Sequence, residues 1–426
     1  MPSGRGVLPR HLLPLTASTD AAGRLSIGGV DLCELAAEHG TPLFVYDELH
    51  LRERCREAVA AFGAGASYAS KAFLCKAMAA LVAEEGMGID VATGGELHVA
   101  LAAGTDPAKI VLHGNNKSEA ELAAAVGAGV GRIVVDSYDE LDRLESLAAA
   151  GARPPQVLLR ITPGVEAHTH VYVQTGQDDS KFGFTLSTGA AAAAVTRAEA
   201  SPAVELVGVH AHIGSNVFAL SSFALAVDAL AGFVGPLGLP ELSLGGGLGV
   251  AYVEGEETPS ITEWAGVLHR ACSAAGIAAR IAVEPGRSIV AGAAVTLYTV
   301  GTMKEVAGVR TFLAVDGGMS DNPRPVLYGS GYETFLPRAA DADRPFVAHV
   351  VGKHCESGDL IVRDAALPAD VAIGDVLATP VTGAYGHSMA SNYNKVPRPA
   401  VVFVADGEAR LVVRRETLDD LLRLDL

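Results

Sequence analysis

Several short stretches of the 426-residue chain place reactive or anion-binding groups directly after apolar runs. Lys71 follows one such run, and an amine that is desolvated at the mouth of a fold is a good nucleophile for carbonyl groups. Backbone amides, a hydroxyl and a cation suited to a phosphate group come from three stretches: residues 245–249 (GGGLG), Gly214 with Ser215, and Gly286 with Arg287. The sequence therefore predicts a phosphate site near a reactive lysine.

A carboxylate completes this set. Glu284 follows another apolar run, directly before Gly286 and Arg287. Pyridoxal 5'-phosphate needs a lysine for its aldehyde, an anion site for its phosphate and a carboxylate for its ring nitrogen. Lys71 alone would be interpreted as a surface lysine at a helix start, but the combination favours this cofactor. His212 would pack on the ring face, although a single histidine on a strand is more often a core residue.

The glycine stretch 245–249 also resembles part of a dinucleotide-binding fingerprint. It follows the seventh apolar run rather than the first, and no acidic residue stands at the distance of a ribose partner within a βαβ unit. Phosphate binding by the last loops of a barrel is the better interpretation.

Short β-type runs alternate with longer helical runs along residues 66–283. The expected strands are residues 66–68, 89–91, 110–112, 133–135, 157–161, 206–212, 242–244 and 281–283. The expected helices are residues 74–85, 95–103, 118–128, 138–150, 188–200, 221–237 and 262–275. Strict alternation favours parallel strands, and eight strands predict an α/β fold with a closed (β/α)8 barrel. Residues 162–186 exceed a normal βα loop, a length typical of functional segments.

Polar residues collect where these strands end. They are Ser70, Lys71, Asp90, His113, Asn115, Arg160, His210, His212 and Glu284. Barrel enzymes place their chemistry at the carboxyl ends of the strands. Each residue alone is explained as a cap or a loop residue, but their joint position predicts a site at this end.

The last third of the chain has a different pattern. Alternating strand-like runs at 295–300, 312–315, 346–351, 375–381 and 400–404 are separated by Gly, Pro and Asp turns. Residues 24–30 show the same pattern. We therefore expect a barrel over residues 43–292 and a second, mainly antiparallel β domain over residues 1–42 and 293–426.

Composition excludes several classes of protein. With 32 basic and 49 acidic residues the formal charge is −17, which disfavours nucleic acid as a partner. The sequence has no uninterrupted apolar stretch of the length needed to span a membrane, and we expect no signal peptide. The five scattered cysteines form no CxxC pair, so no zinc ribbon, metal site or disulfide framework is expected. A cytoplasmic protein fits this pattern best.

The motifs resemble those of the fold-type III pyridoxal-phosphate decarboxylases. The barrel motifs are YASKA at 68–72, DVATGGEL at 90–97, GVHAHIGS at 208–215, LGGGLG at 244–249 and EPGR at 284–287. The motifs of the last third are DGGMSDNPRPVLY at 316–328, GKHCESGD at 352–359 and GAYGHSMASNYNKVPRP at 383–399. These last motifs resemble the diaminopimelate decarboxylases more than the ornithine or arginine decarboxylases. The resemblance runs from about Thr41 to Pro399 and departs at minor places such as Phe73 and Asn216.

The resemblance implies decarboxylation of meso-2,6-diaminopimelate to L-lysine, the last step of lysine biosynthesis, with a role for each matching residue. Lys71 holds the cofactor aldehyde, His212 stacks on the ring and Glu284 pairs with its nitrogen. The remaining implied cofactor contacts are Asp90, Ser215, Gly245, Gly246, Gly247, Gly286, Arg287 and Tyr385, with Arg160 nearby. The implied substrate contacts are Arg287, Arg324, Tyr328, Glu356 and Tyr385.

The resemblance also implies a homodimer with shared active sites, in which Cys355 and Glu356 act on the cofactor of the neighbouring subunit. Cys355 is then the proton donor. A lone cysteine is more often a buried core residue. The polar surroundings of Cys355, with Glu356 and a turn glycine at 358, argue against that reading.

Other readings of the same residues differ in substrate or in class. A related decarboxylase would act on carboxynorspermidine, arginine or a carrier-bound amino acid. Arg324 is suited to a second substrate carboxylate. Together with Glu356 it argues against carboxynorspermidine and arginine, but not against a carrier-bound amino acid. An alanine-racemase-like enzyme would lack the motifs at 352–359 and 383–399. A regulatory pseudoenzyme would be expected to lose Lys71 or Cys355, and both are present.

Overall fold

The computed structural model describes residues 6–165 and 178–426, and the chain folds into two compact units. One unit, here called the β unit, comprises Met1–Glu53, Val250–Glu257 and Ile289–Leu426. The other, the barrel unit, comprises Arg54–Gly249 and Thr258–Ser288. The expected division at residues 43 and 292 differs from this one at residues 43–53 and 250–257, which belong to the β unit. Strand β4 (Leu43–Asp47) pairs with strands of the β unit, which takes residues up to 53 with it.

The barrel unit has eight parallel strands. In sheet order they are β13 (Arg280–Ala282), β12 (Glu241–Ser243), β11 (Glu205–His210), β9 (Gln156–Thr162), β8 (Arg132–Val135), β7 (Ile110–Leu112), β6 (Gly88–Val91) and β5 (Ser67–Ala69). A parallel bridge between Ala66 and Val283 brings the two edge strands together, and the Ser67 N–H donates to the Val283 carbonyl at 3.0 Å. The predicted (β/α)8 barrel is therefore confirmed.

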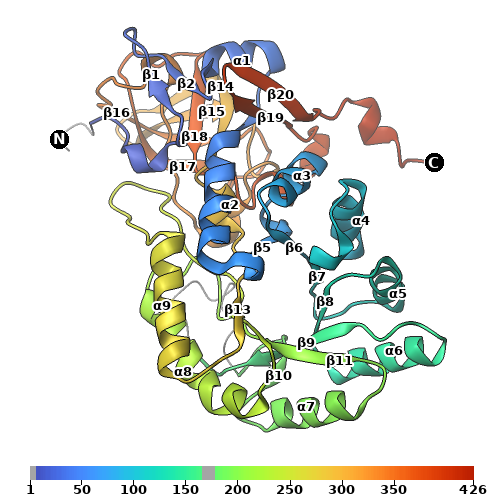
Figure 1. The fold of residues 1–426 in the computed structure, drawn as a ribbon. Coiled ribbons are helices and arrows are strands. Elements are labelled where there is room, and N and C mark those ends of the chain that lie inside the picture. The colour runs from blue at the N-terminus through green and yellow to red at the C-terminus, as the bar shows by residue number, and fades with distance from the viewer. Residues whose placement is uncertain (1–5, 166–177) are drawn as a thin grey trace. The chain divides into compact units, whose positions relative to one another are not determined.

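Helices lie outside this ring of strands (Figure 1). They are α3 (Lys76–Glu84), α4 (Gly94–Ala102), α5 (Glu119–Ala128), α6 (Tyr138–Ala149), α7 (Ala190–Ala200), α8 (Leu220–Leu237) and α9 (Ile261–Ala274). Each coincides with an expected helix to within a few residues. Ser118 and Ser260 cap the N-termini of α5 and α9 with capping boxes. In each, the serine hydroxyl accepts a hydrogen bond from the N–H of the third helical residue, a glutamate, whose side chain accepts one from the serine N–H. Strand β10 (Phe184–Thr185) pairs with β9 inside the long segment 162–186, of which residues 166–177 lie outside the described part.

Helix α8 is long and apolar enough, with a mean hydropathy of 1.6, to meet the length and composition of a membrane span. Burial accounts for part of this composition, since 33% of the stretch is buried. Phe223, Val227, Leu230 and Val234 are buried, and the Phe223 ring packs edge-on against Trp264 of α9 at 5.4 Å. An apolar crossover helix of a barrel has this character without any membrane.

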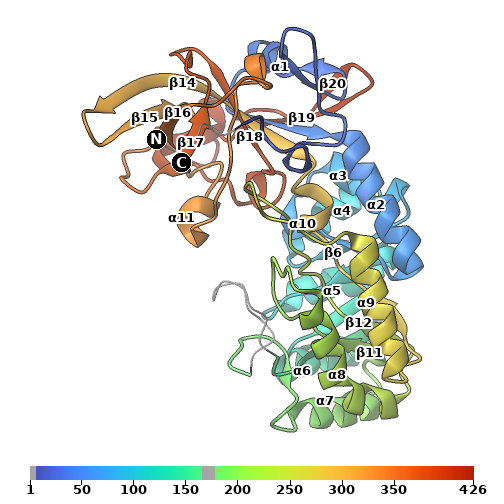
Figure 2. The same ribbon diagram turned by 90° about the vertical axis from the view of Figure 1, so that its left-hand side faces the viewer.

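The main sheet of the β unit has the order β17–β16–β15–β14–β4–β19–β20, with β18 also paired to β14. Its other strands are β14 (Ala294–Val306), β15 (Arg310–Val315), β16 (Phe346–Val351), β17 (Leu360–Leu367), β18 (Val376–Pro380), β19 (Ala400–Ala405) and β20 (Glu408–Val413). Figure 2 shows β14 and β15 as a long hairpin. Most pairs are antiparallel, as predicted, whereas β15 with β16 and β4 with β19 are parallel.

The N-terminal segment forms short strands within the β unit, as expected from residues 24–30. Residues 24–30 do not join the main sheet; β1 (Ser18–Thr19), β2 (Leu25–Ile27) and β3 (Val30–Asp31) form a small antiparallel sheet of their own. The N-terminal strand that joins the main sheet is β4. The remaining α-helices are α1 (Leu32–His39), α2 (Glu48–Phe62), α10 (Arg287–Val290) and α11 (Arg324–Tyr328). The 3-10 turns are η1 (Arg10–Leu12), η2 (Gly63–Gly65), η3 (Ser70–Ala72), η4 (Pro107–Lys109), η6 (Pro337–Ala339), η7 (His387–Met389), η8 (Tyr393–Lys395) and η9 (Asp419–Leu422).

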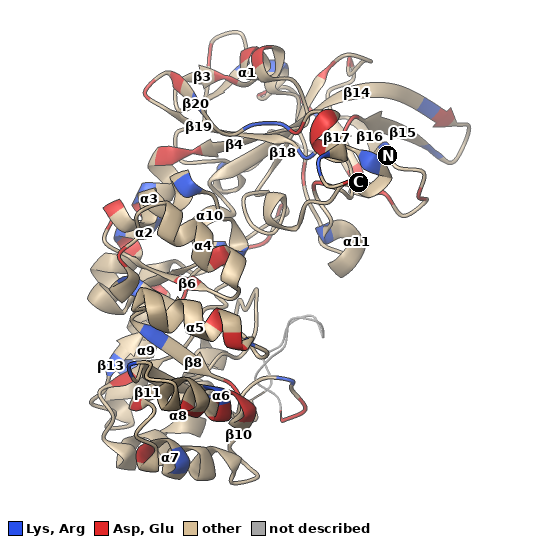
Figure 3. Cartoon of the chain, turned by 90° about the vertical axis from the view of Figure 1, so that its right-hand side faces the viewer, with Lys and Arg blue, Asp and Glu red and all other residues tan. Residues whose placement is uncertain are grey.

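Basic and acidic residues are interspersed over the helices of the barrel unit (Figure 3). Ion pairs between side chains such as Arg197 and Glu145, at 3.0 Å, are part of this pattern.

Candidate active site

Glu284 lies at the carboxyl end of β13 and is held by three side chains from other strands. The Ser243 hydroxyl donates to Oε1 at 2.8 Å, and His210 Nε2 lies 3.1 Å from Oε2. His113 Nε2 lies 3.3 Å from Oε1. Burial opposes ionisation of Glu284, but His113 and His210 outweigh it and hold the pKa of the carboxyl well below its usual range. Glu284 is therefore a buried carboxylate that carries its charge at neutral pH.

Asp90, at the end of β6, approaches the same nitrogen of His113 as Glu284 does. Asp90 Oδ1 lies 3.5 Å from His113 Nε2. Burial and the charge of Glu284 raise the pKa of Asp90 to about 6, although His113 opposes the shift. Burial lowers the pKa of His113, but the charges of Asp90 and Glu284 raise it, and the net shift is upward. Burial lowers the pKa of His210 to about 4. The geometry therefore pairs a cationic His113 with two carboxylates and leaves His210 neutral.

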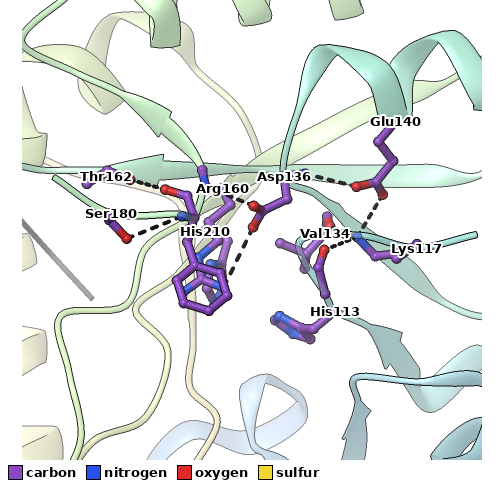
Figure 4. A network of polar contacts seen from close by, with 12 residues as sticks. His113, Lys117, Val134, Asp136, Glu140, Arg160, Thr162, Ser180 and His210 are labelled. Atoms are coloured by element: carbon purple, nitrogen blue, oxygen red, sulfur yellow. Dashed lines mark hydrogen bonds and ion pairs between the residues drawn. The ribbon is translucent and has the colours of Figure 1, made fainter. Parts of the chain in front are cut away.

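A second buried group of charges lies beside this one (Figure 4). Arg160 of β9 stacks on the Phe182 ring at 4.2 Å, and its Nη1 lies 3.7 Å from Asp136 Oδ1. Burial lowers the pKa of Arg160, and the charges of Asp136, Glu284 and Asp90 oppose the shift. Arg160 is thus a buried cation that acts on both carboxylates of the site by charge.

His212 is placed by the glycine stretch after β12. The Gly246 N–H donates to His212 Nδ1 at 3.2 Å. A Cβ on Gly245 would come within 2.6 Å of the same nitrogen, and one on Gly246 within 2.2 Å of the Glu284 carbonyl. Burial, followed by the charge of Lys71, lowers the pKa of His212 well below its usual value. A neutral ring held against backbone in this way suits stacking on a flat cofactor.

Lys71 lies on η3, directly after β5. The expectation that this lysine is desolvated is wrong for the structure: the turn buries its neighbours Ser70 and Ala72 and leaves Lys71 exposed. Its charge nevertheless acts on Asp90 and His212, so the amine lies within electrostatic reach of the site. An accessible amine at this place is able to reach a carbonyl group.

The loops after β11, β12 and β13 form a cup suited to an anion. Arg287 Nη2 donates to Ser215 Oγ at 2.9 Å. A Cβ on Gly247 would lie 2.3 Å from the Gly214 carbonyl, and one on Gly286 would lie 3.0 Å from Ala69 Cβ. Gly247 has a φ of +112°, a backbone region that favours glycine. The close packing of these loops requires glycine, and it presents backbone, hydroxyl and guanidinium groups to a phosphate.

Apart from Arg287, the candidate substrate residues lie in the β unit. Arg324, the first residue of α11, is buried; its Nη1 donates to the Tyr332 hydroxyl at 2.6 Å, and its guanidinium lies 4.1 Å from the centre of the Tyr252 ring. Tyr328, the last residue of α11, is half-buried. Tyr385 is also half-buried and has a φ of +59°, a strained conformation of the kind found at functional sites.

Cys355 and Glu356 lie in the loop between β16 and β17, and both are exposed. The reading of Cys355 as a buried core cysteine is therefore excluded. Asp359 fixes this loop, because its carboxylate accepts from the N–H groups of Met319 at 2.7 Å and His354 at 2.9 Å. The loop thus presents a thiol and a carboxylate on a rigid base.

The structure brings the sequence-predicted residues into two sets. The barrel unit holds Lys71, Asp90, Arg160, His212, Ser215, Gly245, Gly246, Gly247, Glu284, Gly286 and Arg287. The β unit holds Arg324, Tyr328, Cys355, Glu356 and Tyr385. Sequence reasoning did not single out the roles of His113, His210 and Ser243 around Glu284. Their position at strand ends was the available signal. The ligand atoms of His113, His210 and Glu284 lie within 4.8 Å of one another, as in groups that hold a metal ion.

Comparison with known sequences identifies relatives along the whole chain. Residues 48–291 match the family described as pyridoxal-dependent decarboxylase, pyridoxal binding domain. The diaminopimelate decarboxylase of Mycobacterium tuberculosis is 48% identical over 441 residues, with 98% of each chain covered. That of Bacillus subtilis is 47% identical over 436 residues, covering 96% of this chain and 97% of the relative.

Solved structures give the same result. A diaminopimelate decarboxylase from M. jannaschii in complex with L-lysine has a TM-score of 0.90 at 33% identity, and the match covers 97% of this chain and 98% of that one. The same family thus accounts for the sequence, the barrel and the second unit.

Proposed function

Because the chain belongs to the pyridoxal-dependent decarboxylases, and within them to the diaminopimelate decarboxylases, we propose that it converts meso-2,6-diaminopimelate to L-lysine and carbon dioxide. The buried, ionised Glu284 carries the proposal. A carboxylate that stays charged in a barrel interior suits a protonated ring nitrogen, and the glycine and arginine cup lies in the adjoining loops.

The barrel residues fit pyridoxal 5'-phosphate, which supplies an electron sink for the breaking carbon–carbon bond when bound. Lys71 would hold its aldehyde through the exposed amine. Glu284 would keep the ring nitrogen protonated, and His212 would lie on the ring face. Ser215, Arg287 and the three glycines 245–247 would hold the phosphate, and Tyr385 would add a contact.

Arg287, Arg324 and Tyr328 would bind the substrate carboxylates, and Glu356 would face an amino group. Arg324 suits the carboxylate far from the reacting carbon, since a buried guanidinium already oriented by Tyr252 and Tyr332 is costly to leave without an anion. Cys355 would donate its thiol proton to the carbon that loses the carboxylate. The carbon–carbon bond is thereby replaced by a carbon–hydrogen bond.

We further propose a homodimer with shared sites. Cys355 and Glu356 are exposed on an anchored loop, which suits groups that act on a neighbouring chain. We also propose that the enzyme acts in the cytoplasm, without a nucleic-acid or membrane partner. All five cysteines are free, as expected in a reducing compartment.

Release of carbon dioxide from defined amino acids tests the proposed reaction. The purified protein, loaded with pyridoxal 5'-phosphate, should release carbon dioxide from meso-2,6-diaminopimelate and form equimolar L-lysine. Ornithine, arginine and carboxynorspermidine serve as controls and should give little. Faster release from any of these three would refute the substrate assignment.

A further inference from the structure

Lys117 and Glu140 form a buried ion pair that the proposed reaction does not use directly (Figure 4). Each side chain is only 2% exposed, and Lys117 Nζ lies 2.7 Å from Glu140 Oε1. Burial lowers the pKa of Lys117 and raises that of Glu140, so the environment favours the charged forms of neither. A buried pair of this kind is weak support for stability, since apolar residues of similar volume often stabilise a protein as well or better.

The distinctive property of Lys117 is the set of groups that it joins. Its ammonium donates to three acceptors at 2.7 Å: the Gly114 carbonyl, the Val134 carbonyl and Glu140. The three acceptors lie after β7, on β8 and on α6. All three N–H donors of the ammonium are therefore engaged, and they link three elements of the fold.

Two of the three hydrogen bonds of Lys117 reach backbone carbonyls that lie one or two residues from His113 and Asp136. Gly114 directly follows His113, whose Nε2 lies 3.3 Å from Glu284 Oε1. Val134 comes two residues before Asp136, whose Oδ1 lies 3.7 Å from Arg160. A shift of either carbonyl would move the attached side chain, because the backbone between them is short and inextensible.

Glu140, the third acceptor of Lys117, also contacts Asp136. Glu140 Oε2 accepts a hydrogen bond from the Asp136 N–H at 3.2 Å, and Asp136 Oδ2 accepts one from the Gly183 N–H at 3.0 Å. Asp136 is thereby held from two sides with its other oxygen toward Arg160. Lys117 and Glu140 are thus hydrogen-bonded to the backbone beside His113 and to that of Asp136, the partner of Arg160.

We propose that Lys117 and Glu140 are positioning residues for the ring-nitrogen site, acting through His113 and the Asp136–Arg160 pair. This inference rests on the proposed function only in assuming that Glu284 holds the cofactor ring. Neither residue touches the cofactor or the substrate.

A double variant separates positioning from stability. Lys117→Met alone leaves Glu140 buried without its partner and should lower the melting temperature. Lys117→Met with Glu140→Leu removes both charges and should recover part of that loss, because the Gly114 and Val134 carbonyls and the Asp136 N–H still lose their partners. It does not restore the links between the three elements. Arg197→Met serves as the matched control, because Arg197 of α7 forms partly exposed ion pairs with Asp142 and Glu145 of α6, the helix that carries Glu140.

The readout is the dissociation constant of pyridoxine 5'-phosphate for the cofactor-free protein, measured by calorimetry. This probe has the ring nitrogen and the phosphate but no aldehyde, so its binding does not require a bond to Lys71. The double variant should bind it at least tenfold more weakly than wild type. With the cofactor loaded and diaminopimelate as substrate, kcat should fall at least tenfold while KM changes less than twofold. Arg197→Met should match wild type in all these measurements.

Asp136→Asn keeps an acceptor for the Gly183 N–H and removes only the charge toward Arg160, so it tests the contact with Arg160 if the double variant does not fold. It should weaken pyridoxine 5'-phosphate binding about threefold. Wild-type affinity in a folded double variant, or in Asp136→Asn, would overturn the inference. If wild type binds the probe but releases no carbon dioxide from diaminopimelate, only the proposed substrate fails. If it does not bind the probe, both proposals fail.

Discussion

The Nε2 atom of His354 lies 2.8 Å from the Oγ atom of Ser320, and this hydrogen bond joins two loops that are 34 residues apart in the sequence. On the other side of the ring, His354 Nδ1 lies 3.0 Å from Asn394 Oδ1. His354 is buried, whereas the next two residues, Cys355 and Glu356, are exposed. The imidazole therefore fixes the base of the loop that presents the proposed proton donor.

Replacement of His354 by leucine should lower kcat at least fivefold. Loss of the bonds to Ser320 and Asn394 frees the loop that carries Cys355, and hydrogen bonds of this kind contribute about 1 kcal/mol each. Steady-state kinetics with diaminopimelate checks this. The affinity for pyridoxine 5'-phosphate should not change, and His98→Leu, at an exposed histidine of α4, is the control. An unchanged kcat in a folded variant would show that the loop does not depend on His354.

Lys71→Ala should abolish activity together with covalent attachment of the cofactor. Its amine is exposed directly after β5 and acts by charge on Asp90 and His212, as expected for the lysine that holds the aldehyde. Borohydride reduction followed by mass spectrometry of the peptides locates the attachment. A reducible adduct that persists in Lys71→Ala would show that another lysine is responsible. Lys76→Ala, five residues along the chain, should retain both properties.

Arg324→Ala should reduce kcat/KM for diaminopimelate at least tenfold and leave cofactor binding intact. A hydrogen bond to a charged group contributes roughly 1.5–3 kcal/mol, and more when its partner is left buried without it. Because Arg324 also stacks on Tyr252, the melting temperature must be measured alongside the kinetics. Arg324→Lys keeps the charge but not the flat guanidinium, and it should restore only part of the activity. Equal efficiency in all three proteins would remove Arg324 from the site.

Asp321→Asn should remove a loss of stability that the protein undergoes between about pH 4 and 7, although its amide nitrogen cannot accept the Gly318 N–H that Asp321 Oδ2 accepts at 2.8 Å. Burial raises the pKa of Asp321 to about 7, although the Tyr298 hydroxyl, 2.6 Å from Oδ1, opposes the shift. As the pH rises above about 4, the unfolded chain loses this proton first, so the native state loses stability until the pH passes about 7. Asparagine has no proton to lose. Relative to its value at pH 4, the difference in melting temperature should therefore move in favour of Asp321→Asn up to pH 7 and stay constant above it. A difference that grows toward acid would reverse this assignment.

The sequence was sufficient for the barrel because its strands and helices alternate regularly and each strand is followed by polar residues. It was not sufficient for β4. Residues 43–47 are buried on both faces, so they lack the alternation that marks a strand with one exposed face. Strand β4 pairs with β14 and β19, which lie far along the chain. A local sequence pattern does not predict such pairing.

The site shows the same limit. Lys71, the glycine stretch and Glu284 carry local signals, since each stands directly after an apolar run. The contacts that give Glu284 its charge come from His113 and His210 on other strands, and only the closed barrel brings them together. Lys117 and Glu140 are 23 residues apart, one in the loop after β7 and the other on α6. Their pairing depends on the packing of α6 against the loop after β7, which no spacing rule encodes.

A homodimer with shared sites should show complementation between two inactive variants. If Cys355 and Glu356 act on the cofactor held by Lys71 of the neighbouring chain, the two inactive variants Lys71→Ala and Cys355→Ala should complement each other. In a mixed dimer one site carries both substitutions and the other carries neither. Random exchange makes about half of the dimers mixed, so about a quarter of wild-type activity should return, by the symmetry of an isologous pair. Each variant alone, taken through the same exchange, is the control. Were both residues supplied by one chain, every site would carry one lesion and mixing would restore nothing. With subunit exchange verified by differently tagged chains, that result would mean that the β unit serves its own barrel.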